Sequence, residues 1–455
     1  MLLEETRPVT RPNVVVAVLA MGGIVVSLMQ TLVIPLLPRF PQLLGSSPGD
    51  TTWLITATLL ASAVATPVVG RLGDMYGKRR MLVVSLVMLV TGSVIAALSH
   101  SLVPLIAGRV VQGLAVGVIP LGISIMRDEL PAERLASATA LMSASLGVGG
   151  ALGLPAAAFL AEQSDWHLLF WTSAAAGVIV LAAVLTCVPE SAVRSGGRFD
   201  LVGALGLSVA LVCLLLGVSK ASTWSGAATT GLFVGAAVAL GLWGWWELRS
   251  AQPLVDLRTT ARRQVLLTNV ASAVFAFSMF AQSLVLPQIL QLPASTGHGL
   301  GQSLLVTGLV LVPSGLVMML MAPVSARITT ARGPRATLML GTVVVALGYG
   351  TGVILMSAVW QLVVVSAVMG AGIGLAYGAM PALIMSAVPT SETAAANSLN
   401  TLMRAIGTSV SSAVAGVVLT QVTVPFSFKL IMGMGAATAL LACAVAAFIP
   451  RRRTA

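Results

Sequence analysis

Residues 70–80 read GRLGDMYGKRR and concentrate charge in a chain that has only 9% charged residues. The charged members of this stretch are Arg71, Asp74, Lys78, Arg79 and Arg80. The glycines are Gly70, Gly73 and Gly77. Glycine permits tight turns and close approach of helices, and one acid among basic groups can form a cluster of ion pairs. The stretch therefore predicts a turn that holds helices together at one face of the molecule.

The composition indicates an all-α integral membrane protein. Hydrophobic residues make up 57% of the 455 residues, the mean hydropathy is +1.00, and apolar segments of about twenty residues recur along the chain. A soluble protein of this length would need a large charged surface, which excludes a soluble enzyme or binding module.

Fourteen apolar segments are predicted to cross the membrane. Their ranges are 13–37, 51–70, 81–98, 102–126, 137–161, 167–188, 200–219, 228–247, 264–290, 303–326, 336–356, 358–386, 395–420 and 428–449. The first segment is longer than the apolar region of a signal peptide and lacks a small-residue cleavage site, so a retained helix is expected.

The basic residues predict the orientation, because short loops rich in Lys and Arg stay in the cytoplasm. With both termini inside, 20 of the 25 basic residues fall on the cytoplasmic side. These include Arg7, Arg11 and Arg451–Arg453 near the chain ends, and only Arg39, Lys220 and Lys429 fall outside. A multi-pass protein of the cell inner membrane is expected. The net charge of +11 is spread over short loops, so no nucleic-acid partner is expected.

Residues that bind metals or nucleotides form no recognisable pattern. Cys187, Cys213 and Cys443 all lie in apolar segments, His100, His167 and His298 are far apart in sequence, and no phosphate loop is present. We expect no metal, no cofactor and no enzyme activity.

An internal repeat divides the chain. Residues 326–336, ARITTARGPRA, align with residues 70–80 without a gap, and the run around Pro389 resembles the run around Pro131. Two six-helix bundles are predicted, at 1–198 and 263–455, with an inserted two-helix pair and linker at 199–262. Repeats of this kind are typical of secondary transporters, which bind substrate between the halves and alternate access by rocking.

With these motifs the sequence resembles the major facilitator superfamily, and within it the fourteen-helix drug:proton antiporters, over nearly the whole chain. GRLGDMYGKRR is similar to the family's loop signature between the second and third helices. LIAGRVVQGLAVG (105–117) resembles the fourth-helix motif, with Arg109, Gln112 and Gly113. SLGVGGALGLP (145–155) resembles the glycine-rich fifth-helix motif of exporters, formed here by Gly147, Gly149, Gly150, Gly153 and Pro155. The resemblance implies a 6+2+6 arrangement and proton-coupled export.

Two arginines lie inside predicted helices. An arginine in the bilayer costs roughly 2.5 to 3.5 kcal/mol on insertion scales, so Arg109 should face a cavity or a buried partner; the family resemblance favours proton coupling. Arg404 shares a polar helical face, and its expected partner is Asp74 or Asp128 at a cytoplasmic gate. The other members of that face are Asn397, Asn400, Thr401, Thr408 and Ser411. Asp128 has a second interpretation, an ion pair with Arg71, Arg79 or Arg127.

The first helix departs from the family pattern D-x-T-I-V-N-V-A-L-P. Residues 29–38 read MQTLVIPLLP, so Met29 replaces the acid, and no Asp or Glu lies deep in any predicted helix. Three alternatives stay open for coupling. An acid at a helix end could hold the proton, Arg109 could act with a carboxylate of the substrate, or transport could be uncoupled. The candidate acids are Asp128, Glu129, Glu162 and Asp165.

The expected cavity contains amides, thioethers and few aromatic rings, which suits an amphipathic organic substrate that is neutral, zwitterionic or anionic. Its candidate residues are Met29, Gln30, Thr31, Gln112, Met279, Gln282, Gln288, Tyr377 and Met380. The predicted function is proton-coupled export of a small organic compound by a monomer surrounded by lipid. A translocator of lipids or amphiphiles and a non-transporting membrane sensor are the alternatives.

Overall fold

The computed structural model describes residues 12–37, 39–163, 165–191, 193–220, 224–296, 299–421 and 426–450. The terminal arginines used to predict the orientation, Arg7, Arg11 and Arg451–Arg453, lie outside these residues, as does His298. The described residues form helices and connecting turns and contain no strand, which confirms the all-α prediction.

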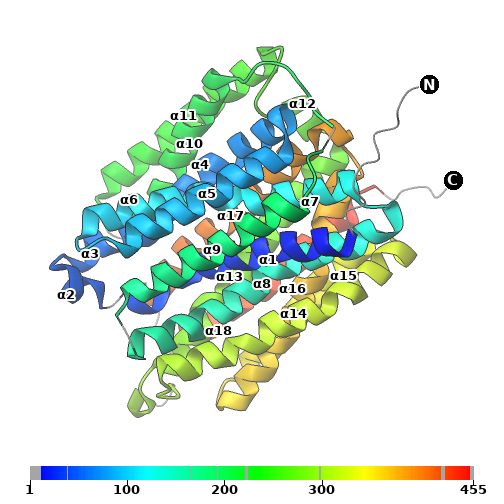
Figure 1. Cartoon of the computed structure of the whole chain (residues 1–455). Coiled ribbons are helices and arrows are strands. Elements are labelled where there is room, and N and C mark those ends of the chain that lie inside the picture. The colour runs from blue at the N-terminus through cyan, green and yellow to red at the C-terminus, as the bar shows by residue number, and fades with distance from the viewer. Residues whose placement is uncertain are drawn as a thin grey trace, which may run out of the picture.

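Long helices follow one another along the chain (Figure 1). The first group is α1 (Pro12–Thr31), α4 (Trp53–Tyr76), α5 (Lys78–Ala97), α6 (Leu102–Gly113), α7 (Val118–Glu129), α8 (Ala132–Gln163) and α9 (His167–Cys187). Next come α10 (Leu201–Lys220) and α11 (Gly226–Arg249). The second group is α13 (Arg263–Gln291), α14 (Leu304–Arg332), α15 (Pro334–Ile354), α16 (Val359–Met385), α17 (Thr393–Gln421) and α18 (Phe426–Ala447). The short elements are η1 (Ile34–Leu36), α2 (Phe40–Leu44), α3 (Pro48–Thr51), η2 (Leu114–Gly117), α12 (Leu257–Thr260), η3 (Ala294–Thr296) and η4 (Thr390–Glu392).

Twelve helices in the described part of the chain are long and apolar enough to cross a membrane, with α6 to α7 counted as one. The protein is therefore a multi-pass membrane protein. The helices α13 and α17, 29 residues each, are not among the twelve. Asn, Ser and Thr side chains along α17 make it less apolar than its neighbours. The prediction of fourteen spans is thus not confirmed by hydropathy.

Two predicted helices have different ends or shape. The first apolar segment, predicted over 13–37, is helical only to Thr31 and continues as the turn η1 and the short helices α2 and α3. The fourth, predicted over 102–126, is interrupted by the 3₁₀ turn η2. At the start of this turn Ser62 Oγ donates a hydrogen bond to the Gly113 carbonyl, 3.0 Å away, so the interruption lies where the helix packs closely against α4.

The two groups of helices meet along two seams. The α4–α17 seam joins α4 to α17, and the α8–α14 seam joins α8 to α14. The helix α10 packs against both α4 and α17, whereas α11 packs mainly on α10 at the edge of the bundle (Figure 1). Only 6% of the apolar window of α11 is buried, so its surface is available to lipid. We call the end of the bundle at the α4–α5 turn the gate end.

Candidate functional site

The carboxylate of Asp74 joins the two groups of helices at the gate end. Its Oδ1 accepts a hydrogen bond from Ala394 N at 3.2 Å, and its Oδ2 accepts one from Ala395 N at 2.8 Å. Both donors lie in the first turn of α17, where N–H groups lack helical acceptors and the helix dipole favours an anion. The side chain of Asp74 is fully buried. This contact between α4 and the α17 N-terminus is called the latch below.

A buried lysine supports the latch. Lys78 Nζ lies 2.6 Å from Asp128 Oδ2 and 3.8 Å from Asp74 Oδ1, and its side chain has no exposed area. Ser191 Oγ donates to the same Asp128 oxygen at 2.5 Å. Asp128 therefore forms an ion pair, but its partner is Lys78 and not one of the predicted arginines.

Arg127 forms a second bridge between the groups. Its Nη1 donates to Thr393 Oγ1 at 2.6 Å, and its Nη2 donates to the Val388 carbonyl at 3.0 Å. Arg127 was expected from the sequence only as an ion-pair partner of Asp128, and this bridge was not predicted. Its position in the last turn of α7, within the repeated run around Pro131, was the available signal.

The glycines of the GRLGDMYGKRR stretch allow these contacts. A Cβ at Gly70 would lie 2.8 Å from the Ala394 carbonyl and 2.6 Å from Ser398 Cβ, so a larger residue would push α4 away from α17. Gly77 has φ 120°, a left-handed value that favours glycine, and it ends α4 directly before α5. Arg79 donates from Nη2 to the Leu185 carbonyl at 2.6 Å and so ties the turn to α9.

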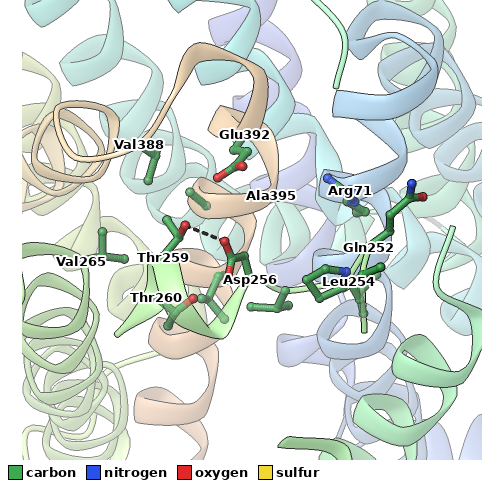
Figure 2. A pocket seen from close by; sticks show the side chains of 15 residues that line it. Arg71, Gln252, Leu254, Asp256, Thr259, Thr260, Val265, Val388, Glu392 and Ala395 are labelled. Atoms are coloured by element: carbon green, nitrogen blue, oxygen red, sulfur yellow. Dashed lines mark hydrogen bonds between the residues drawn. The ribbon is translucent and has the colours of Figure 1, made fainter. Parts of the chain in front are cut away.

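Arg71 lines a pocket of about 230 Å³ at the gate end, between α4, the segment 251–256 and α17. Figure 2 shows Arg71 and Gln252 on one side of it and Glu392 and Val388 on the other. Asp256 in its wall accepts hydrogen bonds from Arg258 N at 2.9 Å and Thr259 Oγ1 at 2.7 Å. Burial raises the pKa of this carboxyl, but the hydrogen bonds outweigh burial and hold the pKa below its usual range.

Arg109 is buried in the first group without a carboxylate partner among the described ion pairs. Its Nη1 donates to Gln112 Oε1 at 2.8 Å, its Nε donates to the Leu54 carbonyl at 3.1 Å, and Met29 Sδ lies 3.4 Å from Nη1. Gln112 Nε2 in turn donates to Ser93 Oγ at 2.8 Å. The structure thus brings together Arg109, Gln112 and Met29, and the residue in the place of the missing acid touches the arginine.

Arg404 has a different partner from the predicted ones. Its guanidinium lies 4.5 Å from the ring centre of Tyr377, and its Nη2 donates to Thr401 Oγ1 at 3.2 Å. Asp74 instead forms the latch with α17, and Asp128 forms an ion pair with Lys78. On the same polar face, Asn400 Nδ2 donates to Asn269 Oδ1 and to Ser272 Oγ, both at 2.9 Å, which ties α17 to α13.

The other cavity candidates differ in burial and in their contacts. The side chain of Gln282 is buried, and its backbone N–H donates to the Tyr349 hydroxyl at 3.0 Å, whereas Gln30 and Gln288 are half-buried. The Thr31 hydroxyl donates to the Leu28 carbonyl at 3.0 Å, and a Cβ at Gly153 would lie 3.0 Å from Thr31 Cβ. Thr31 therefore lies at the contact between α1 and α8.

The glycine-rich motif of α8 contacts two helices. A Cβ at Gly149 would lie 2.7 Å from Ser27 Cβ of α1, and one at Gly147 would lie 3.1 Å from Met318 Cγ of α14. From the opposite side of the seam, a Cβ at Gly308 would lie 2.8 Å from Pro155 N. Gly150 is more open, with Ser27 Oγ 3.8 Å from its Cβ position. Small residues therefore allow close helix packing on both sides of α8, as the motif predicted.

The model of the Major Facilitator Superfamily matches residues 19–286 and 268–455, so the chain belongs to this superfamily of membrane transporters. It is 29% identical over 418 residues to the uncharacterized MFS-type transporter Rv1877 of Mycobacterium tuberculosis, with 89% of this chain and 59% of that protein covered. It is 27% identical to the tetracenomycin C resistance and export protein of Streptomyces glaucescens, with 90% of this chain and 76% of that protein covered. The chain thus spans about three fifths of the length of the first relative.

Solved structures agree on the fold. The human organic anion transporter MFSD10 (TETRAN) superimposes with a TM-score of 0.69 at 15% identity, covering 97% of this chain and 100% of that chain. The proton:xylose symporter XylE superimposes with a TM-score of 0.66 at 14% identity, covering 96% of each chain. These neighbours are transporters and not enzymes, and the chain has their fold.

Proposed function

We propose that the protein exports small organic compounds, such as a drug, an antibiotic or a secondary metabolite, across the cell inner membrane by alternating access and proton antiport. The similarity to a tetracenomycin C export protein supports this direction and substrate class. In this proposal the chain spans the membrane fourteen times in a 6+2+6 arrangement, with bundles at 1–198 and 263–455 and the inserted helix pair and linker at 199–262. The gate end and both termini lie in the cytoplasm. The functional unit is a monomer.

The latch is the observation on which the proposal rests. Asp74 holds the α17 N-terminus through two charge-assisted hydrogen bonds, and Arg127 adds a second bridge between the same two groups of helices. These contacts close the gate end. Because they are few and directional, they can break in one step when the halves rock and substrate enters from the cytoplasm.

Arg109 is the proposed element of coupling and substrate recognition. It is buried beside the Met29 sulfur and has only neutral hydrogen-bond acceptors. A buried cation without a carboxylate favours neutral, zwitterionic or anionic substrates over cations, because an approaching anionic group would neutralise it.

Proton flux in inside-out vesicles with an acidic interior tests the proposal. Cationic, zwitterionic and anionic antibiotics are added in turn, and the pH of the lumen is followed. Export coupled to protons predicts alkalinisation with zwitterionic or anionic compounds, which Arg109→Ala abolishes. Arg109→Lys, which keeps the positive charge, should retain part of the proton flux. Uptake of a compound without proton movement would refute antiport, and no uptake of any compound would refute export.

A groove in the α8–α14 seam favours translocation of an amphiphile as the second candidate. It has a volume of about 360 Å³, opens between α1, α8 and α14, and is lined mainly by apolar side chains. Arg134 at its edge donates to Asn13 Oδ1 at 3.2 Å and supplies a positive charge. Fluorescent lipids in proteoliposomes test this candidate: faster flipping than in protein-free vesicles supports it, and equal rates exclude it.

A further inference from the structure

Two carboxyl groups meet at the gate end of the inserted helices. Glu247 lies in the last turn of α11, and Asp200 directly precedes α10. A Cβ at Gly203 would lie 2.7 Å from Glu247 Oε1 and 2.6 Å from Asp200 Oδ2, so both carboxyl groups crowd the space that this glycine leaves free. Glu247 is only 3% exposed, and neither of its carboxyl oxygens forms a hydrogen bond of normal geometry.

The charged groups around this pair do not neutralise Glu247. Arg249 of the same helix lies over the Trp245 ring, 4.2 Å from its centre. Arg258 of α12 donates from Nη2 to the Leu248 carbonyl at 3.4 Å. Asp256 lies on the segment between α11 and α12. Its side chain is the N-cap of α12 and accepts a hydrogen bond from Arg258 N. Among the ion pairs of the described residues, none includes Glu247 or Asp200.

The hydrogen bonds of normal geometry at the pair go to Asp200. Trp246 Nε1 lies 3.0 Å from Asp200 Oδ2, and Gly203 N lies 2.8 Å from Asp200 Oδ1. These N–H groups stabilise a negative charge on Asp200. The N–H groups of Leu254, Val255 and Trp243 face Glu247, but none of them forms a hydrogen bond of normal geometry with it. A second carboxyl group nearby disfavours ionisation of the buried Glu247, and an unpaired buried carboxylate costs far more than a neutral acid.

We infer that Glu247 and Asp200 form a proton-binding site that holds one proton, on Glu247, beside the carboxyl group of Asp200. The site belongs to the inserted helix pair and stands apart from Arg109 and from the latch. A bound metal ion fits less well, because N–H donors already face Asp200 and a hard cation requires several further oxygen ligands.

The site lies under a segment that covers the α4–α17 seam. The residues 250–256, called the strap, directly follow α11, and Glu247 faces the backbone of Leu254 and Val255. The strap side chains Leu254 and Val255 are 1% and 7% exposed and belong to one apolar cluster with Ala63 of α4 and Leu402 of α17. Loss of the proton places a negative charge on Glu247 beside Asp200, and repulsion between the two carboxyl groups displaces Glu247 and loosens the strap packed on it. The proton state of the inserted pair therefore controls access to the gate end.

Infrared spectroscopy of the full-length protein in lipid tests the site directly. The wild-type protein should show the C=O band of a buried carboxylic acid at neutral pH that disappears as the pH rises. The band should be absent in Glu247→Gln, shifted along the pH axis in Asp200→Asn, and unchanged in Glu133→Gln, which alters an exposed acid. No such band in the wild type, or one that persists in Glu247→Gln, would overturn the inference.

A spin label at the exposed Ala251 tests the effect on the strap, after replacement of Cys187, Cys213 and Cys443 by serine. The label should become mobile in the wild type over the same pH range in which the infrared band disappears. In Glu247→Gln, which mimics the protonated acid, it should stay immobile throughout. The same pH dependence in both proteins would refute control of the strap by Glu247.

Discussion

The two seams between the halves are built in opposite ways. At the α4–α17 seam, Asp74 reaches the backbone N–H groups of Ala394 and Ala395 with a buried charge. At the α8–α14 seam, backbone meets backbone, as a Cβ at Gly315 would lie 2.6 Å from the Gly147 carbonyl. Directional hydrogen bonds are lost after a small displacement, whereas a surface of close-packed small residues can pivot without losing its contacts.

This difference assigns a role to each seam. In the proposed alternating access, the α4–α17 seam is the side that separates when the gate end opens, and the α8–α14 seam is the side about which the halves rotate. The inserted helix α10 packs on the separating side, against α4 and α17, and its strap crosses the same side. The insertion is therefore placed where it can sense or limit opening.

The largest expected effect follows from Lys78→Ala. This change leaves Asp128 and Asp74 buried without their cation, and breaking a buried pair costs about 3–5 kcal/mol. The thermal unfolding temperature of the purified protein should fall sharply and little folded protein should be recovered. Lys429→Ala removes an exposed lysine and serves as control. Equal unfolding temperatures for the two variants would show that the pair does not stabilise the gate end.

Asp74→Asn should have the next largest effect. It removes the charge from the latch but keeps the shape, and a hydrogen bond to a charged group contributes about 1.5–3 kcal/mol. The closed state of the gate end should become about 10- to 100-fold less favoured relative to the open state, since 1.4 kcal/mol corresponds to a factor of ten. Proton-coupled flux in vesicles should fall at unchanged expression; unchanged flux would remove Asp74 from the mechanism.

Gly315→Ala tests the other seam. The added Cβ would lie 2.5 Å from Ala151 Cβ and would push α14 away from α8, and overpacking of this kind costs about 1–3 kcal/mol. The thermal unfolding temperature of the purified protein should fall as a result of this loss of stability. Gly350→Ala, where no atom lies within 4 Å, should instead stabilise its helix by up to about 1 kcal/mol. If both variants behaved alike, the seam would not be close-packed.

The smallest effect is expected for Arg80→Ala. Arg80 Nε lies 3.9 Å from Glu190 Oε2, and the arginine side chain is 69% exposed. Exposed ion pairs contribute about 0–1 kcal/mol, so unfolding temperature and flux should stay near the wild-type values. A fall in unfolding temperature comparable to that of Lys78→Ala would mean that the stability of the gate end depends on its total positive charge and not on buried ion pairs.

The sequence predicted the helical membrane fold and the close packing of the α8 glycines, because these depend on local patterns. It grouped Arg404 with Asp74 and Asp128, whereas the fold places Arg404 over the ring of Tyr377. It did not predict that Asp74 binds backbone N–H groups, since no side chain at Ala394 or Ala395 signals an anion site. Nor did it predict the Lys78–Asp128 pair or the burial of Glu247, because both depend on segments brought together only by the fold. The 3₁₀ turn at 114–117 likewise arises where the fourth span packs against α4.

The distance across the gate end tests the account most directly. Spin labels at the exposed Tyr76 and Thr390, in a variant without native cysteines and reconstituted in lipid, report the separation of the two halves beside the latch. The wild type should show mainly one short distance, and Asp74→Asn should add a longer, well-populated one. Identical distance distributions in the two proteins would contradict the claim that Asp74 holds the gate end closed.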